Sequence, residues 1–150
     1  MGVKIQKILV PVDFSSHSTK AMDTAVEFAK AFSAEVQLLH AYSLPVGVVG
    51  PYDYQIPANI LGEMRDSAAR RIDEEVKKVS DLGVTASGMI TEGVPAQAIV
   101  DAAEQIGADL IVMGTRGLTG LKHVVLGSVA ERTIRHASCA VLTVQDPNGD

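Results

Sequence analysis

The sequence predicts an α/β protein in which helices cover both faces of a five-stranded parallel sheet. Five short runs rich in Val, Ile and Leu alternate along the 150 residues with four segments of helical apolar spacing. Strict alternation favours parallel strands joined by right-handed crossovers, which is a doubly wound arrangement. With 47% hydrophobic and 21% charged residues, the chain has the balance of a globular protein and is predicted to form one domain, residues 1–150.

The first strand is predicted within the apolar run 5–13, which ends in a turn. Ser15 and Ser16 follow as candidate N-caps of the first helix, because a side-chain oxygen there accepts from free helix N–H groups. A second strand is expected over 35–42. The stretch 43–59 is rich in Pro and Gly and longer than an ordinary connection, which predicts a functional or interface loop.

A long amphipathic helix is predicted after this loop, and Gly83 suits the position just past its end. The third strand is expected over 84–90. The inward face of the long helix is predicted to carry Met64, Ala68, Ile72, Val76 and Val79.

The remaining elements are located by Pro, Gly and Ser residues that typically begin or end helices and strands. Pro95 suits the first position of the third helix, and 109–113 is the clearest strand. Ser128 is predicted to open the fourth helix, and 140–144 to form the last strand. The end of the chain, 147–150, is expected to be a frayed tail.

Charge and composition narrow the function classes. A net charge of -5 and a pI near 5.3 argue against nucleic acid or an anionic membrane as a partner. The single cysteine, Cys139, allows no intrachain disulfide and is expected to be structural. The N-terminus has no signal-peptide core and no run reaches the ~20 apolar residues of a membrane span, so a cytoplasmic location is expected.

Glycines cluster after the fourth predicted strand in the spacing Gly114-x2-Gly117-x9-Gly127-Ser128. A glycine there can adopt positive φ and lets the backbone approach a ligand closely. The first N–H groups of the next helix are unpaired donors at the positive end of its dipole. Together with the Ser128 hydroxyl and the Arg116 guanidinium, they are suited to hold a phosphate chain.

A purely structural interpretation of these residues stays open. Ser128 with Glu131 three residues later has the pattern of a capping box, and a glycine after a strand is often a turn residue. Two other phosphate motifs are excluded. The Walker pattern Gly-x4-Gly-Lys-Ser/Thr does not occur, and the turn at 12–15 lacks the glycines of a dinucleotide fingerprint.

The glycine spacing is similar to the ATP-binding signature of the universal stress protein family. The likeness extends over essentially the whole chain: 8–15 resembles the family's first strand and turn, 108–114 its fourth strand, and 126–130 the start of its fourth helix. The resemblance implies a fold like that of the adenine-nucleotide α-hydrolases, with strand order 3-2-1-4-5.

The resemblance also implies a homodimer in which the last strand, here 141–145, pairs antiparallel with its two-fold mate. The chain departs from the family pattern at Ala140, where a proline is usual.

Carried over residue by residue, the resemblance implies a nucleotide between the first turn and the glycine loop. Asp13 would make a polar contact, although it could instead cap the first helix, and the Ala41 backbone would meet the adenine edge. His40 is expected to be a hydrogen-bonded core histidine. Mg²⁺ would be coordinated by the phosphate oxygens of the nucleotide. No residue is assigned a catalytic role. The expected nucleotide-binding residues are Pro11, Val12, Asp13, Ala41, Met113, Gly114, Arg116, Gly117, Gly127, Ser128 and Val129.

The function expected from this resemblance is that of a dimeric regulatory or sensor module. It would bind ATP, or AMP, ADP or cyclic AMP, and act on an unidentified regulatory protein partner. Two alternatives stay open. One is a slow ATPase or nucleotidyl-transfer enzyme on the same scaffold, and the other is a nucleotide-free dimeric interaction protein that uses the loop 43–59.

Overall fold

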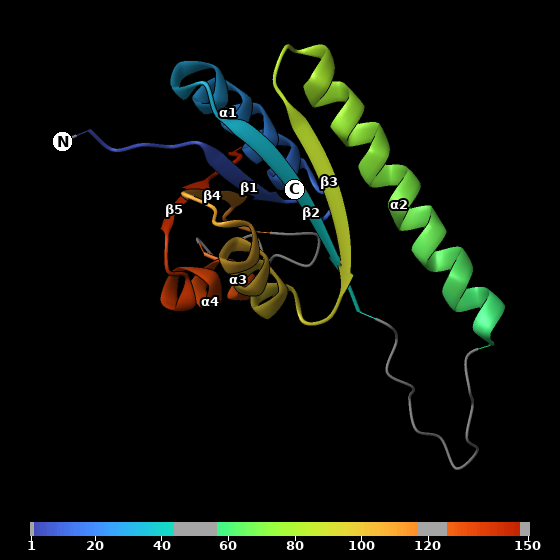
Figure 1. The fold of residues 1–150 in the computed structure, drawn as a ribbon. Coiled ribbons are helices and arrows are strands. Elements are labelled where there is room, and N and C mark those ends of the chain that lie inside the picture. Colours follow the sequence, from blue (N-terminus) through green and yellow to red (C-terminus); the bar gives the residue numbers. More distant parts are fainter. Residues whose placement is uncertain (1, 44–56, 117–125, 148–150) are drawn as a thin grey trace.

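The computed structural model describes residues 2–43, 57–116 and 126–147 (Figure 1). Strands and helices alternate along these residues in the predicted order. Of the predicted tail 147–150, only Pro147 is among the described residues. The elements are β1 (Lys7–Pro11), α1 (Ser16–Phe32), β2 (Glu35–Tyr42), α2 (Ala58–Asp81), β3 (Ala86–Glu92), α3 (Pro95–Ile106), β4 (Leu110–Gly114), α4 (Ser128–His136) and β5 (Ala140–Val144).

The five strands form one parallel sheet in the order β3-β2-β1-β4-β5. This confirms the predicted fold class and the strand order that the resemblance implied. The chain winds outward from β1 to β3 and then returns past β1 to β4 and β5. The winding direction therefore reverses between β1 and β4, and ligands of such sheets bind beyond the carboxyl ends of the strands at this point.

Helices cover both faces of the sheet (Figure 1). One core layer joins α1 and α2 to strand residues such as Val10 and Leu38, and the other joins α3 and α4 to residues such as Leu9 and Leu39. Neighbours along a strand belong to different layers because successive side chains point to opposite faces. Among the described residues, no helix is long and apolar enough to cross a membrane.

The predicted helix ends are confirmed at several positions. Ser15 is the N-cap of α1, and its side chain accepts from the N–H of Ser18 at 3.2 Å. Pro95 is the first residue of α3, and Gly107 ends that helix with φ 66°. Gly83 follows α2 with φ 89°. These two glycines adopt the left-handed conformation that a side chain would strain.

Two strand boundaries differ from the sequence prediction. β3 lies two residues later than 84–90 because its ends are set by pairing with β2, where Glu92 stands opposite Tyr42. β4 begins and ends one residue later than predicted, because its last residue pairs with Val144 of β5. Strand pairing is a non-local property, so local hydrophobicity did not determine these ends.

The start of α2 also differs from the prediction. The helix begins at Ala58, inside the loop predicted over 43–59, and residues 44–56 of that loop lie outside the described residues. Met64 was predicted to face inward but is 37% exposed, because the first turns of α2 extend past the strand ends (Figure 1). The buried residues of α2 are Ala68, Ile72 and Val79.

Candidate functional site

The end of β1 is fixed firmly to β2. Pro11 is the last residue of the strand, and the next residue, Val12, is 3% exposed. The Val12 N–H donates to the Leu39 carbonyl at 2.7 Å, and the Val12 carbonyl accepts from His40 Nδ1 at 2.8 Å. The chain therefore leaves the sheet at a defined point, which places Asp13 at the carboxyl edge.

Asp13 holds the start of α1 in place. Its Oδ1 accepts the backbone N–H of Ser15 at 3.0 Å and also the Ser15 hydroxyl. Ser15 in turn caps the helix, so the alternative that Asp13 is itself the cap is wrong. The carboxylate is half-buried and lies where the sequence analysis expects a nucleotide contact.

The end of β2 presents different residues on its two faces. His40 lies on the same face as Leu38, toward α1 and α2, and Ala41 lies on the face of Leu39, toward α3 and α4. The hydrogen bond from His40 to the Val12 carbonyl confirms the prediction of a hydrogen-bonded histidine. Ala41 is half-buried near the carboxyl end of the strand, on the side where α4 begins.

The end of β4 and the start of α4 are packed closely together. The Gly127 N–H donates to the Thr115 carbonyl at 2.6 Å, and a Cβ on Gly127 would lie 3.1 Å from that oxygen. A Cβ on Gly114 would lie 2.8 Å from the Cβ of His17. Neither glycine is among those with positive φ. Both therefore serve close approach of the backbone, and the positive φ that the sequence allowed is not used here.

Helix α4 begins without a side-chain cap. Gly127 is the N-cap and Ser128 the first helical residue, so the predicted capping box is wrong. Glu131 forms an ion pair with Arg135 at 2.7 Å instead. The first N–H groups of a helix have no partner within it, and they attract anions. With the exposed Ser128 hydroxyl, they form the part of this edge that is suited to hold a phosphate.

The other predicted residues flank this helix start. Met113 is 4% exposed, Val129 packs against the same core layer, and Arg116 is half-buried two residues beyond β4. Gly117 lies outside the described residues. Apart from Gly117, the predicted nucleotide residues therefore gather around the carboxyl ends of β1, β2 and β4 and the start of α4.

Thr115 is a further candidate ligand contact, and the sequence did not predict it. Its side chain is 7% exposed, and its Oγ1 has no hydrogen-bond partner among the described residues. The same holds for Nδ1 of His17, which is buried behind Gly114. A buried polar atom without a partner is costly, so it marks a place where a ligand or a water would bond. The available signal was the position of Thr115 inside the glycine motif.

Neither thiol nor metal chemistry finds support at the described residues. Burial raises the pKa of the Cys139 thiol, and the charge of Asp109 raises it further, against a backbone hydrogen bond that lowers it. A thiol with a raised pKa is a weak nucleophile at neutral pH. Within 2–43, 57–116 and 126–147, no group of three or more His, Cys, Asp or Glu residues is placed to hold a metal ion.

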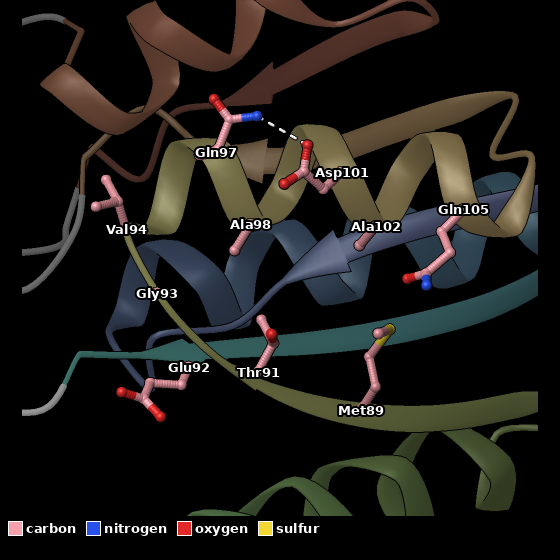
Figure 2. A pocket seen from close by; sticks show the side chains of 10 residues that line it. All are labelled: Met89, Thr91, Glu92, Gly93, Val94, Gln97, Ala98, Asp101, Ala102 and Gln105. Carbon is pink, nitrogen blue, oxygen red and sulfur yellow. Dashed lines mark hydrogen bonds between the residues drawn. The ribbon is translucent and has the colours of Figure 1, made fainter.

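Hollows open on the surface of the described residues, and two of them lie beside the sheet. One, of about 160 Å³, lies between β3 and α3, where Figure 2 shows Met89 and Thr91 pointing toward Ala98 and Ala102. The other, of about 380 Å³, lies between the turn after β1, the end of β2 and α2. None of the predicted nucleotide residues lines either hollow.

Comparison with known proteins decides the family. Residues 4–145 match the family described as the universal stress protein family. The chain belongs to the universal stress protein family. Universal stress protein MJ0531 of Methanocaldococcus jannaschii is 40% identical over 144 residues, which cover 95% of this chain and 83% of that protein.

Solved structures share the fold of this universal stress protein. MJ0577, from the same archaeon as MJ0531, superposes with a TM-score of 0.84 at 31% identity and covers 97% of this chain and 99% of its own. A universal stress protein in complex with cAMP superposes with a TM-score of 0.69 at 26% identity, covering 95% and 98%. On this shared fold, the present universal stress protein places a carboxylate and an uncapped helix start at one edge of the sheet.

Proposed function

We propose that this universal stress protein binds an adenine nucleotide at the carboxyl edge of β1, β2 and β4. We further propose that it acts as a sensor, because the bound nucleotide changes how the protein meets a regulatory partner. ATP is the proposed ligand, with AMP, ADP and cAMP as close alternatives. The observation that carries the proposal is the uncapped start of α4, held against β4 by the Gly127–Thr115 hydrogen bond of 2.6 Å. The cAMP complex of a relative on the same fold supports it.

The proposed binding mode divides the nucleotide between the two ends of this edge. The phosphates lie at the first N–H groups of α4, with the Ser128 hydroxyl and the Arg116 guanidinium beside them. The adenine lies toward Ala41, and Asp13 contacts the ribose side. Mg²⁺ binds through the phosphate oxygens, because it keeps several waters and needs few protein ligands.

In the proposed sensor, Asp13 has a positioning role. Phosphoryl transfer needs a group that orients the attacking water or hydroxyl. Asp13 is the carboxylate that the sequence places at this edge, and its Oδ1 already accepts two hydrogen bonds from Ser15. We therefore assign it to positioning the turn and the nucleotide.

The proposal includes a homodimer through β5 and a location in the cytoplasm. β5 lies at the edge of the described sheet, and its residues 141–144 are only half-buried in the single chain. Pairing with a two-fold mate would satisfy the open backbone edge. The nucleotide would then change how this dimer meets a regulatory partner.

Substitution of Gly127 tests the proposal. Its φ of -72° and ψ of 165° are open to any residue, so Gly127→Val should fold. Its side chain would crowd the Thr115 oxygen and the start of α4. We expect calorimetry with Mg-ATP to show one site per chain in the wild type and at least about tenfold weaker binding in Gly127→Val.

Gly62→Ala is the matched control, because nothing lies within 4 Å of a Cβ at this helical position. It should bind Mg-ATP as the wild type does. Equal affinity of Gly127→Val and the wild type would show that the nucleotide does not lie at α4. Absence of binding to the wild type would leave a nucleotide-free interaction protein.

A further inference from the structure

We propose that the hollow between the turn after β1, the end of β2 and α2 binds a small aromatic carboxylic acid. At about 380 Å³, it falls within the range of small-molecule sites. It lies on the sheet face opposite to Ala41, so it is separate from the proposed nucleotide site and does not depend on it. Among the residues that line it are Phe14, His40, Ile60, Glu63, Met64 and Arg71.

Three side chains in this hollow form a stack. The rings of Phe14 and His40 lie 4.7 Å apart at 49°, and the Arg71 guanidinium carbon lies 3.8 Å from the centre of the Phe14 ring. The three residues come from the β1–α1 turn, β2 and α2. The stack therefore ties together three segments and holds a cation at a fixed place above an aromatic surface.

The backbone at Phe14 is unusual in a way that favours a functional role. Phe14 has φ 64°, a left-handed conformation that is rare for a bulky residue. The turn is held on both sides, since Asp13 accepts from Ser15 and Val12 is bonded to β2. Strained residues that their surroundings hold in place cluster at binding sites. Here the strained turn carries the Phe14 ring to the hollow.

His40 contributes a ring whose Nδ1 donates to the backbone. A carbonyl can only accept, so the contact between His40 Nδ1 and the Val12 carbonyl places the ring proton on Nδ1. In the neutral form of the ring, the lone pair lies on Nε2. A ligand that carries an N–H or O–H group beside its aromatic ring matches this acceptor.

Charge indicates which end of the ligand is acidic. Arg71 is exposed, and no Asp or Glu in 2–43, 57–116 or 126–147 forms an ion pair with it. Glu63 lies eight residues earlier on α2, roughly 12 Å along the helix, too far to neutralise it. The guanidinium is therefore available to a carboxylate, which it binds in a bidentate manner.

Apolar side chains account for the aromatic body of the ligand. Ile60 and Met64 are 42% and 37% exposed where they line the hollow. Large apolar residues that gather at a concave surface mark a binding surface. A flat ring that covers them would remove apolar area from water while its carboxylate meets Arg71.

The test uses indole-3-acetate, which combines an indole N–H, a flat ring and a carboxylate. The chain contains no Trp, so the fluorescence anisotropy of the ligand can be followed without protein indole signal. We expect saturable binding to the wild type. Arg71→Ala should raise the half-saturating concentration about tenfold through loss of a charged hydrogen bond.

Arg70→Ala is the matched control. Arg70 is the preceding exposed residue on α2 and does not line the hollow, so this variant should bind as the wild type does. Tryptamine, in which an ammonium replaces the carboxylate, should bind much more weakly than indole-3-acetate. Gly127→Val should leave indole-3-acetate binding unchanged, which separates this site from the nucleotide site.

Three results would overturn the proposal. They are no saturation with millimolar indole-3-acetate, equal binding by Arg71→Ala and the wild type, and equal binding of tryptamine and indole-3-acetate. If Gly127→Val abolished indole-3-acetate binding while Arg71→Ala kept it, the ligand would occupy the nucleotide site instead.

Discussion

A side chain at Gly127 is disfavoured by lack of space and not by backbone conformation. Its φ and ψ suit any residue, but a Cβ would lie 3.1 Å from the Thr115 oxygen, closer than an ordinary contact. The motif spacing predicted that this position matters. The reason depends on how the end of β4 meets the start of α4, and a linear pattern does not contain that distance.

Sequence reasoning at the residue scale succeeds where one residue type has one structural use. Ser15 caps α1 and Pro95 begins α3 as predicted. It correctly begins α4 at Ser128, but the alternative of a capping box at Ser128 fails because the N-cap is Gly127. It also passes over Thr115, because a threonine becomes informative only when its burial is known.

Cys139 should react slowly with alkylating reagents. Burial raises the pKa of its thiol, and only the thiolate reacts. At neutral pH, the rate with iodoacetamide should therefore lie below that of cysteine in a short unstructured peptide with blocked ends. The midpoint of its rise with pH should lie above the midpoint for this peptide, and a midpoint at or below that value would contradict the prediction.

At the scale of elements, hydrophobic spacing predicted the type and order of every strand and helix. It was less accurate at ends that pairing decides, as β3 shows, because strand ends follow the register with a neighbour. Met64 lines the hollow between α2 and the end of β2, on the inward face that its spacing predicted, but it is 37% exposed. The helix extends beyond the sheet there, and periodicity carries no information about where a neighbouring element stops.

The contact between α2 and β3 gives a second glycine an identifiable role. A Cβ on Gly88 would lie 2.8 Å from Val76 Cγ2 and 3.1 Å from Ile72 Cγ2. Gly88→Val should therefore lower the free energy of unfolding by ~1–3 kcal/mol through overpacking, as measured by urea denaturation.

A compensating substitution provides the control for this prediction. Val76→Ala removes the atom that the new side chain meets, so Gly88→Val and Val76→Ala together should cost less than the sum of the two single changes. Additive losses, or a Gly88→Val variant as stable as the wild type, would contradict close packing of α2 on β3.

For the whole molecule, alternation of strands and helices was enough to predict a doubly wound parallel sheet. The strand order was implied by the family resemblance and not by the pattern, because several orders satisfy the same alternation. The candidate nucleotide edge could be predicted because the winding direction reverses between β1 and β4, and the family resemblance supplied the residues after these strands.

The hollow beside Arg71 could not be predicted in this way. It joins Phe14 and Arg71, which are distant in sequence and meet only through the packing of α2 beside the β1–α1 turn. The whole fold thus presents two candidate ligand sites, one on each face of the same sheet edge. Adjacent residues of the chain serve the two sites. Asp13 belongs to the nucleotide site and Phe14 to the hollow, while Ala41 belongs to the nucleotide site and His40 to the hollow.

The central claim is that an adenine nucleotide binds at the carboxyl edge of β1, β2 and β4. Its most direct test is the response of individual backbone amide resonances to Mg-ATP. We expect saturable chemical-shift changes concentrated at Asp13, Thr115, Ser128 and Val129, with one common dissociation constant. Changes confined to the hollow of Phe14 and Arg71, or to the groove between β3 and α3, would contradict it, as would unchanged spectra at millimolar Mg-ATP.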